Sequence, residues 1–112
     1  MGFHELLGSL LVAQRVAGRG EINHGFLDPY SLVHVLVGVV TAIYGLGLGV
    51  ATAIAVGWEV IEHLAKNLAP TAFPHPTQDT LANSVGDVLS TACGWAIAVF
   101  VKTRSRDRHR GR

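Results

Sequence analysis

The sequence contains almost no cysteine. Cys93 is the only one among 112 residues, and it lies within an apolar run. A single thiol excludes an internal disulfide and any metal site built from several thiolates. We therefore interpret Cys93 as a packing residue.

Strong catalytic motifs are also missing. The sequence WEVIEH at residues 58–63 has neither the HExxH spacing of zinc proteases nor the ExxH spacing of di-iron bundles. No glycine-rich phosphate loop precedes a helix, since GLGLG at 45–49 is followed by no lysine, and no serine or cysteine triad is visible. We expect no nucleotide cofactor, and enzymatic activity stays open.

The alternation of apolar and polar residues that marks β-strands is absent too. Apolar residues make up 49% of the chain, and Ala, Gly, Val and Leu occur in long runs. This pattern predicts an all-α protein. Its length predicts one domain, at residues 1–101, followed by a basic tail at 102–112.

Charge is missing from residues 35–58, which His34 and Glu59 flank. An uncharged apolar run of roughly 18 or more residues is typical of a transmembrane helix. One straight helix would be about 36 Å long and would separate His34 from Glu59. Two helices folded back at 45–49 would bring them together, and the three glycines there favour this arrangement.

The fold-back predicts two short spans, at residues 30–46 and 50–67. Asp28 is suited to cap the first of them, and Pro29 suits the first helical position because it lacks an N–H. Each span is near the lower limit of ~17 residues for crossing a membrane. Both spans must therefore bury polar side chains.

A third span is predicted at residues 80–101. The preceding sequence LAPTAFPHPTQ, at 68–78, holds three prolines and is predicted to be a loop, after which Thr77 or Asp79 would cap the helix. Small residues recur every four positions in this span, which allows close helix packing inside the bundle. They are Ala82, Gly86, Ser90 and Gly94.

The first residues, 3–17, have the pattern of an amphipathic helix. Phe3, Leu6, Leu7, Leu10 and Leu11 form one apolar stripe, and Gly18 and Gly20 follow the segment. At about 22 Å the helix is short for a bilayer, so we expect it to lie at the membrane interface or against the bundle.

Basic residues crowd the C-terminal end. Residues 102–112 hold one lysine and five arginines, with Asp107 as the only acid. Positive residues beside a span tend to stay cytoplasmic, which predicts a cytoplasmic C-terminus, an external N-terminus and an inner-membrane protein in contact with lipids. Nucleic-acid binding is the rival interpretation, but no aromatic residue is interleaved with the arginines.

This topology gathers polar residues of all three spans at the outer end of the bundle. Ionisable groups in a membrane usually point into the bundle, where they are paired or functional. The candidate ligands of a metal or a polar headgroup are His34, Glu59, Glu62, His63, Asp79, Asn83 and Asp87.

Several of these residues have a simpler interpretation. Glu62 and Lys66, four residues apart, could be an exposed ion pair. Asp79 could be only a cap, His34 a hydrogen-bonded core histidine and Asn83 an interhelical contact. Glu59 and Asp87 lie about two turns deep, and a buried carboxylate needs a partner or a proton. We therefore regard those two as the candidate catalytic residues.

The donor set is rich in oxygen, includes imidazole and has no sulfur. It suits Mg²⁺, Ca²⁺, Mn²⁺, Zn²⁺ or non-haem iron. Three functions follow: a divalent-cation site acting on a lipid or other envelope substrate, an accessory subunit of a larger membrane complex or homo-oligomer joined through glycine and alanine faces, and a proton or ion path. The last ranks lowest because the inner half has few polar residues.

Three motifs resemble a known family. They are NH-x3-DPYSLVH, WEVIEH and DTLANSVGD, and together they cover about residues 23–100. An uncharacterised family of bacterial multi-pass membrane proteins has the similar pattern QH-x2-DxYSFSHxxHG, WExLEN and DSxLNSxxD. The last motif is also similar, more weakly, to VanZ-like membrane proteins. The residues that match are His24, Asp28, Ser31, His34, Trp58, Glu59, Glu62, Asp79, Asn83, Ser84 and Asp87.

The chain departs from this pattern at three points. The second histidine of the first motif is Val37 here, and the asparagine after WExLE is His63. The gap between His24 and Asp28 is one residue longer. The resemblance implies a membrane fold and assigns no activity.

Overall fold

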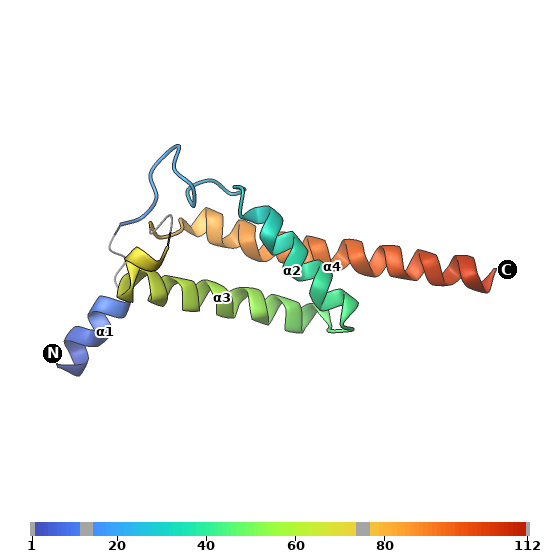
Figure 1. The fold of residues 1–112 in the computed structure, drawn as a ribbon, viewed down its shortest axis with the longest axis horizontal. Coiled ribbons are helices and arrows are strands. Elements are labelled where there is room, and N and C mark those ends of the chain that lie inside the picture. The colour runs from blue at the N-terminus through green and yellow to red at the C-terminus, as the bar shows by residue number, and fades with distance from the viewer. Residues whose placement is uncertain (1, 12–14, 74–76, 112) are drawn as a thin grey trace.

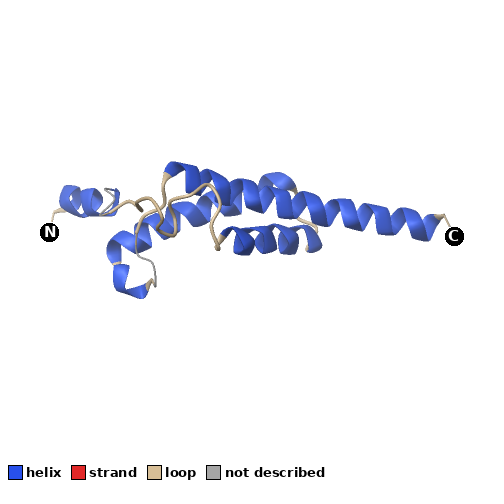
Figure 2. Ribbon diagram, turned by 90° about the horizontal axis from the view of Figure 1, so that it is seen from above, coloured by secondary structure: helices blue, strands red, loops and turns tan. Residues whose placement is uncertain are grey.

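A computed structural model describes residues 2–11, 15–73 and 77–111. Within this part the helices are α1 (Phe3–Leu11), α2 (Ser31–Ile43), α3 (Leu48–Leu68), the short 3₁₀ helix η1 (Pro70–Ala72) and α4 (Leu81–Arg110), and there is no strand. The all-α prediction is confirmed. The molecule is elongated, 66 × 33 × 21 Å, and α4 extends beyond the other helices toward the C-terminus (Figures 1 and 2).

The chain reverses between α2 and α3 at the glycine-rich sequence. Gly45 has φ of +77°, a left-handed conformation that glycine adopts without strain. A contact from α4 stabilises the turn: Trp95 donates its indole N–H to the carbonyl of Leu46 at 2.7 Å. A single straight helix through residues 35–58 is therefore excluded, and α3 runs back along α4 (Figure 1).

Glycines allow α2 and α4 to cross in direct contact. A Cβ added to Gly38 would overlap the carbonyl oxygen of Thr91, and a Cβ added to Gly94 would overlap that of Val35. Of the small-residue stripe on α4, Gly86, Ser90 and Gly94 are buried, whereas Ala82 is exposed. The stripe thus faces the bundle over most of its length.

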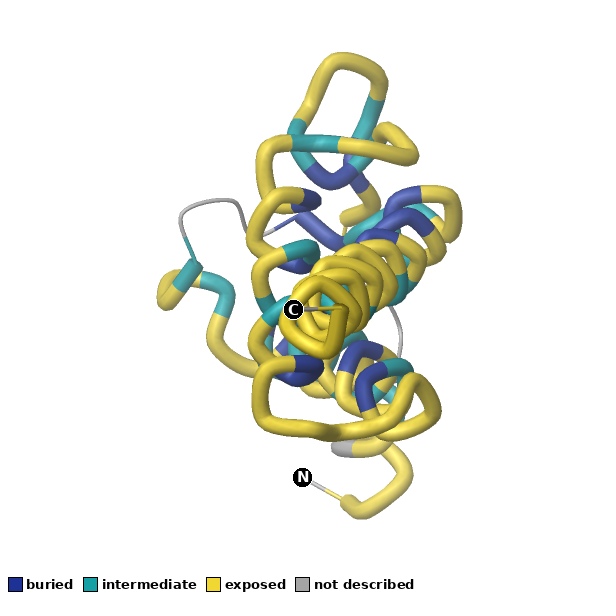
Figure 3. Tube along the Cα trace, turned by 90° about the vertical axis from the view of Figure 1, so that its right-hand side faces the viewer, coloured by how far each residue is buried: buried dark blue, intermediate teal, exposed yellow. Residues whose placement is uncertain are grey.

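The interior is small and largely polar. Among the residues whose burial the structure describes, the buried hydrophobic ones are alanines: Ala17, Ala42, Ala51 and Ala55. The buried polar residues are Asn23, Ser31, His34, Thr41, Lys66, Asn67, Thr77, Gln78, Asn83, Asp87, Ser90 and Thr91. Many large apolar side chains are exposed, and Figure 3 shows how much of the chain is exposed in all. This is the reverse of the usual distribution in proteins surrounded by water.

Helices α3 and α4 are each long and apolar enough to cross a membrane. Helix α2 is apolar but has 13 residues, fewer than the 30–46 span predicts. Helix α3 exceeds its predicted bounds of 50–67 by a residue or two at each end.

The predicted helix over residues 3–17 is too long. Helix α1 is described over Phe3–Leu11, residues 12–14 lie outside the described residues, and residues 15–17 are not helical because they pair with Gln78. Gln78 donates its N–H to the carbonyl of Arg15 (2.8 Å), and Ala17 donates to that of Gln78 (2.9 Å). Backbone pairing with this distant segment replaces the helical hydrogen bonds. The side chain of Arg15 donates to Glu21 Oε1, and this hydrogen bond lowers the pKa of the Glu21 carboxyl.

Two features of α4 also differ from expectation. Its N-cap is Thr80, whose hydroxyl accepts the N–H of Asn83 at 3.1 Å, so neither Thr77 nor Asp79 caps the helix. The helix does not end at 101 but continues to Arg110, because no proline or glycine interrupts the basic tail and cations favour a helix C-terminus. In the proline-rich segment, Pro70 begins η1, while Pro74 and Pro76 lie outside the described residues.

Candidate metal centre

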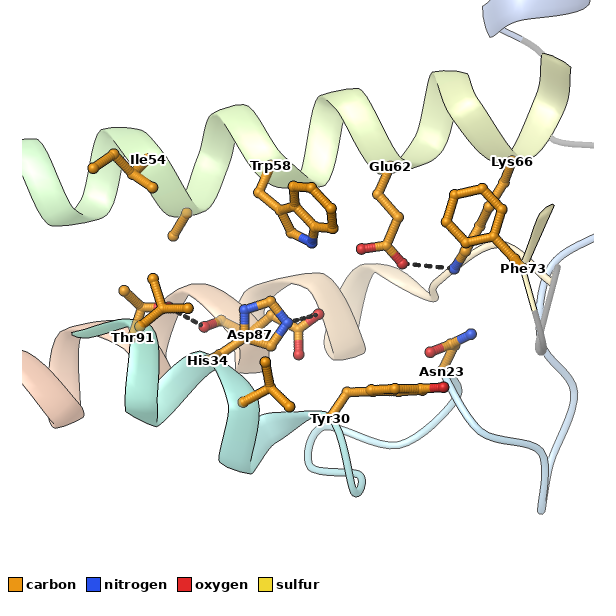
Figure 4. Close-up of a pocket in the computed structure, with 13 residues that line it drawn as sticks. Asn23, Tyr30, His34, Ile54, Trp58, Glu62, Lys66, Phe73, Asp87 and Thr91 are labelled. Atoms are coloured by element: carbon orange, nitrogen blue, oxygen red, sulfur yellow. Dashed lines mark hydrogen bonds and ion pairs between the residues drawn. The ribbon is translucent and has the colours of Figure 1, made fainter. Parts of the chain in front are cut away.

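Three predicted site residues meet between the helices. His34 stands on α2, Glu59 on α3 and Asp87 on α4, and one ligand atom of each lies within 4.8 Å of the others. His34 Nε2 is 3.4 Å from Asp87 Oδ2, and Figure 4 shows these two side chains together in the space between α2 and α3. Because the chain reverses at Gly45, the beginning of α2 and the end of α3 lie at the same end of the molecule. This arrangement lets His34 and Glu59 approach each other.

Two carboxylate oxygens in this group have no hydrogen-bond donor. Asp87 Oδ1 and Glu59 Oε1 are both buried without a partner among the described residues, and Asp87 as a whole is 3% exposed. A buried carboxylate oxygen that contacts no donor costs free energy unless a proton or a cation lies against it. The group therefore has a place for a positive charge.

A second acidic group lies beside the first and shares Glu59. Its other members are Glu62 and Asp79. Here a positive charge is already present: the ammonium of Lys66 is 2.8 Å from Glu62 Oε1 and 3.3 Å from Asp79 Oδ1, and it donates to the carbonyl of Thr77 at 3.0 Å. Lys66 is 3% exposed, so this is a buried ion-paired network and not the exposed helix pair considered from spacing.

The remaining two candidates have structural contacts. Asn83 donates to the carbonyl of Gly25 (2.7 Å) and to Asp28 Oδ2 (3.0 Å), which ties the loop before α2 to α4. His63 belongs to neither carboxylate group, and its Nε2 is 3.5 Å from Asn67 Nδ2. Asp28 does not cap α2 as predicted, because the helix begins at Ser31 after Tyr30 and has no side-chain cap; Asp28 Oδ1 instead accepts the N–H of Tyr30 at 2.9 Å in the preceding turn. The seven predicted ligands thus separate into His34, Glu59 and Asp87, the Lys66 network, and two residues outside both.

A cavity of about 550 Å³ lies next to the three-residue group, between α2 and α3. His34 and Asp87 form part of its wall, and Trp58, Tyr30 and Thr91 also line it (Figure 4). Helical spacing did not predict most of this lining, because in sequence an apolar residue that lines a cavity cannot be distinguished from one that faces lipid. The buried amide of Gln78 was missed as well, although it donates to Asn67 Oδ1 and to the carbonyl of His63.

Comparisons of this chain with models of protein families, with curated proteins and with solved structures find no match.

Proposed function

We propose that this chain is a small multi-pass membrane protein that binds one divalent cation through His34, Glu59 and Asp87. The observation that carries the proposal is that Glu59 and Asp87 each have a buried carboxylate oxygen without a partner, and that each side chain places one oxygen within 4.8 Å of an imidazole nitrogen of His34. Two carboxylates and a neutral imidazole would offset the charge of such an ion.

The ligand types narrow the choice of cation. One nitrogen and carboxylate oxygens suit Zn²⁺, Mn²⁺ or Fe²⁺ better than Cu⁺, which prefers sulfur. Three protein ligands are also the number typical of catalytic zinc sites, which keep a position open for water or substrate. The site could therefore act on a lipid or other envelope substrate, with Glu59 or Asp87 as base, as well as bind an ion.

The distribution of residues supports a membrane environment. Apolar side chains face outward on α2, α3 and α4, and the contacts between helices use glycine, alanine and hydrogen-bonded groups, as in membrane bundles. Helix α2 is about 20 Å long, shorter than the ~30 Å apolar layer of a membrane. Together with the residues on either side of it, it would form a third crossing. This agrees with the multi-pass architecture that the resemblance implies.

Metal analysis tests the site. Detergent-purified protein is expected to carry stoichiometric metal when measured by inductively coupled plasma mass spectrometry, and Asp87→Asn, Glu59→Gln and His34→Gln should each weaken binding by about 10-fold or more. Glu62→Gln is the matched control, because Lys66 already neutralises Glu62. Wild-type protein without metal after supplementation with Zn²⁺, Mn²⁺ and Fe²⁺, or equal loss in the control, would contradict the proposal.

Labelling with a membrane-impermeant maleimide tests the orientation. In a Cys93→Ser background, Ala72→Cys in η1 should react in intact cells, whereas Gly47→Cys in the α2–α3 turn and Arg108→Cys in the tail should react only after permeabilisation. The candidate metal centre lies toward the η1 end of the bundle, so it would open outward. Labelling of positions 47 and 72 from the same side would overturn this orientation.

A second candidate function is that of an accessory subunit or homo-oligomer. At Gly49 and Gly57 on α3, an added Cβ would meet no described atom within 4 Å beyond its chain neighbours and the adjacent helix backbone, and Ala53 lies between them at the same four-residue interval. Such a face allows another helix to approach closely. Co-purification with a larger complex, together with absence of bound metal, would favour this function over the first.

A further inference from the structure

The cavity beside the candidate metal centre has walls of two kinds. Its volume, about 550 Å³, lies within the usual range of ~300 to 1,000 Å³ for small-molecule sites. Most of the lining is apolar and comes from Val33 and Val37 on α2 and from Ile54, Ala55 and Trp58 on α3. His34 and Asp87 also line the cavity, so a molecule inside it would contact two members of the ion-binding group directly.

We propose that this cavity holds the hydrocarbon chain of a single-chain amphiphile whose anionic oxygen headgroup, a carboxylate or a phosphate, coordinates the cation at His34 and Asp87. The inference rests on the proposed function, since it needs the cation. It adds a ligand class: a molecule with one apolar chain and one anionic end.

The position of the cavity suits a ligand that arrives from a membrane. Helices α2 and α3 diverge from their shared turn, and the cavity lies in the space between them (Figures 1 and 4). Many of the side chains around this space are apolar, and several of these are exposed, including Val33 (53%) and Trp58 (48%). A hydrocarbon chain would cover these surfaces and make van der Waals contacts with them along its length.

The charges select the headgroup. Without a cation, the cavity wall presents the carboxylates of Asp87 and Glu62, while the ammonium of Lys66 is already paired with Glu62 and Asp79. An anionic headgroup would be repelled by this wall. A divalent cation with an open coordination position offsets the negative charges of Glu59 and Asp87 and favours oxygen ligands. Binding of the amphiphile must therefore depend on the metal.

Trp58 allows the ligand to be detected in place, because brominated chains quench tryptophan fluorescence on contact. In a Trp95→Phe variant, Trp58 is the only tryptophan. Titration with 9,10-dibromostearate or a dibrominated stearyl phosphate should give saturable quenching in metal-loaded protein. EDTA should weaken the apparent affinity by about tenfold or more, the scale of one lost charge-assisted contact.

Two variants on one helix separate cavity binding from quenching by surrounding detergent. Val37→Phe fills the cavity and should abolish the saturable component, whereas Leu36→Phe, at an exposed neighbouring position outside the cavity, should leave it intact. Metal content of both variants reports whether the ion-binding group has survived the change.

Each other outcome would overturn the inference. Equal quenching by the uncharged dibromostearate methyl ester would show that the headgroup plays no part. Tighter binding of a dibrominated alkyl trimethylammonium after metal removal would show that the site selects cations. Metal binding without saturable quenching would leave the proposed function standing and remove only the amphiphile, whereas protein that binds no metal would remove both.

Discussion

Replacing Gly94 with alanine should destabilise the protein by about 3 kcal/mol or more, the upper range for overfilling a packed interior. The added Cβ would overlap the carbonyl oxygen of Val35 and lie 2.8 Å from its carbonyl carbon. Backbone atoms cannot rotate away as a side chain can, so α2 and α4 would have to separate. Gly38→Ala should have the same effect, because its Cβ would overlap the carbonyl oxygen of Thr91 on the opposing helix.

Unfolding by SDS in mixed micelles, followed by tryptophan fluorescence, measures this loss. Gly57→Ala is the matched control: Gly57 is also a helical glycine, but the new Cβ would meet no described atom of another helix within 4 Å. Alanine is favoured over glycine inside a helix by up to ~1 kcal/mol, so the control should be neutral or slightly stabilised. If Gly94→Ala and Gly57→Ala unfolded alike, the close crossing of α2 and α4 would be wrong.

The approach of His34 to Glu59 could be predicted from sequence because it follows from one local feature. Glycines at 45–49 permit a reversal, and a reversal there places residues equally far from the turn beside each other. The small-residue stripe ending at Gly94 could be predicted similarly, from a four-residue repeat.

Pairings between distant segments could not be predicted in this way. Residues 15–17 leave the helical conformation because Gln78, some sixty residues later, offers backbone partners. The separation of the acidic residues into two groups depends on the direction of the Lys66 side chain. Helical spacing places Lys66 near Glu62, but it does not show that Asp79 and the carbonyl of Thr77 also accept hydrogen bonds from its ammonium. Helical spacing therefore gathered seven candidate ligands into one site, whereas the structure divides them between two groups and leaves His63 and Asn83 outside both.

Replacing Lys66 with methionine should cost about 3–5 kcal/mol of stability, the range for breaking a buried ion pair by removing one partner. Methionine fills a similar space but cannot donate to Glu62, Asp79 or the carbonyl of Thr77. The loss is measurable by the same SDS titration. Lys102→Met, at an exposed position of the α4 tail, should change stability by no more than about 0.5 kcal/mol.

The loss of stability should come more from the unpaired carboxylates of Glu62 and Asp79 than from the missing amine. A triple variant separates these causes. Lys66→Met combined with Glu62→Gln and Asp79→Asn should recover most of the lost stability, because neutral amides need no counter-ion. In the single variant, added Zn²⁺ or Mn²⁺ should also restore stability, since Glu59, Glu62 and Asp79 already hold ligand atoms within 4.8 Å of one another. The triple variant should not respond at this group. Equal responses of the two variants to metal would show that Lys66 does not occupy the position of a cation.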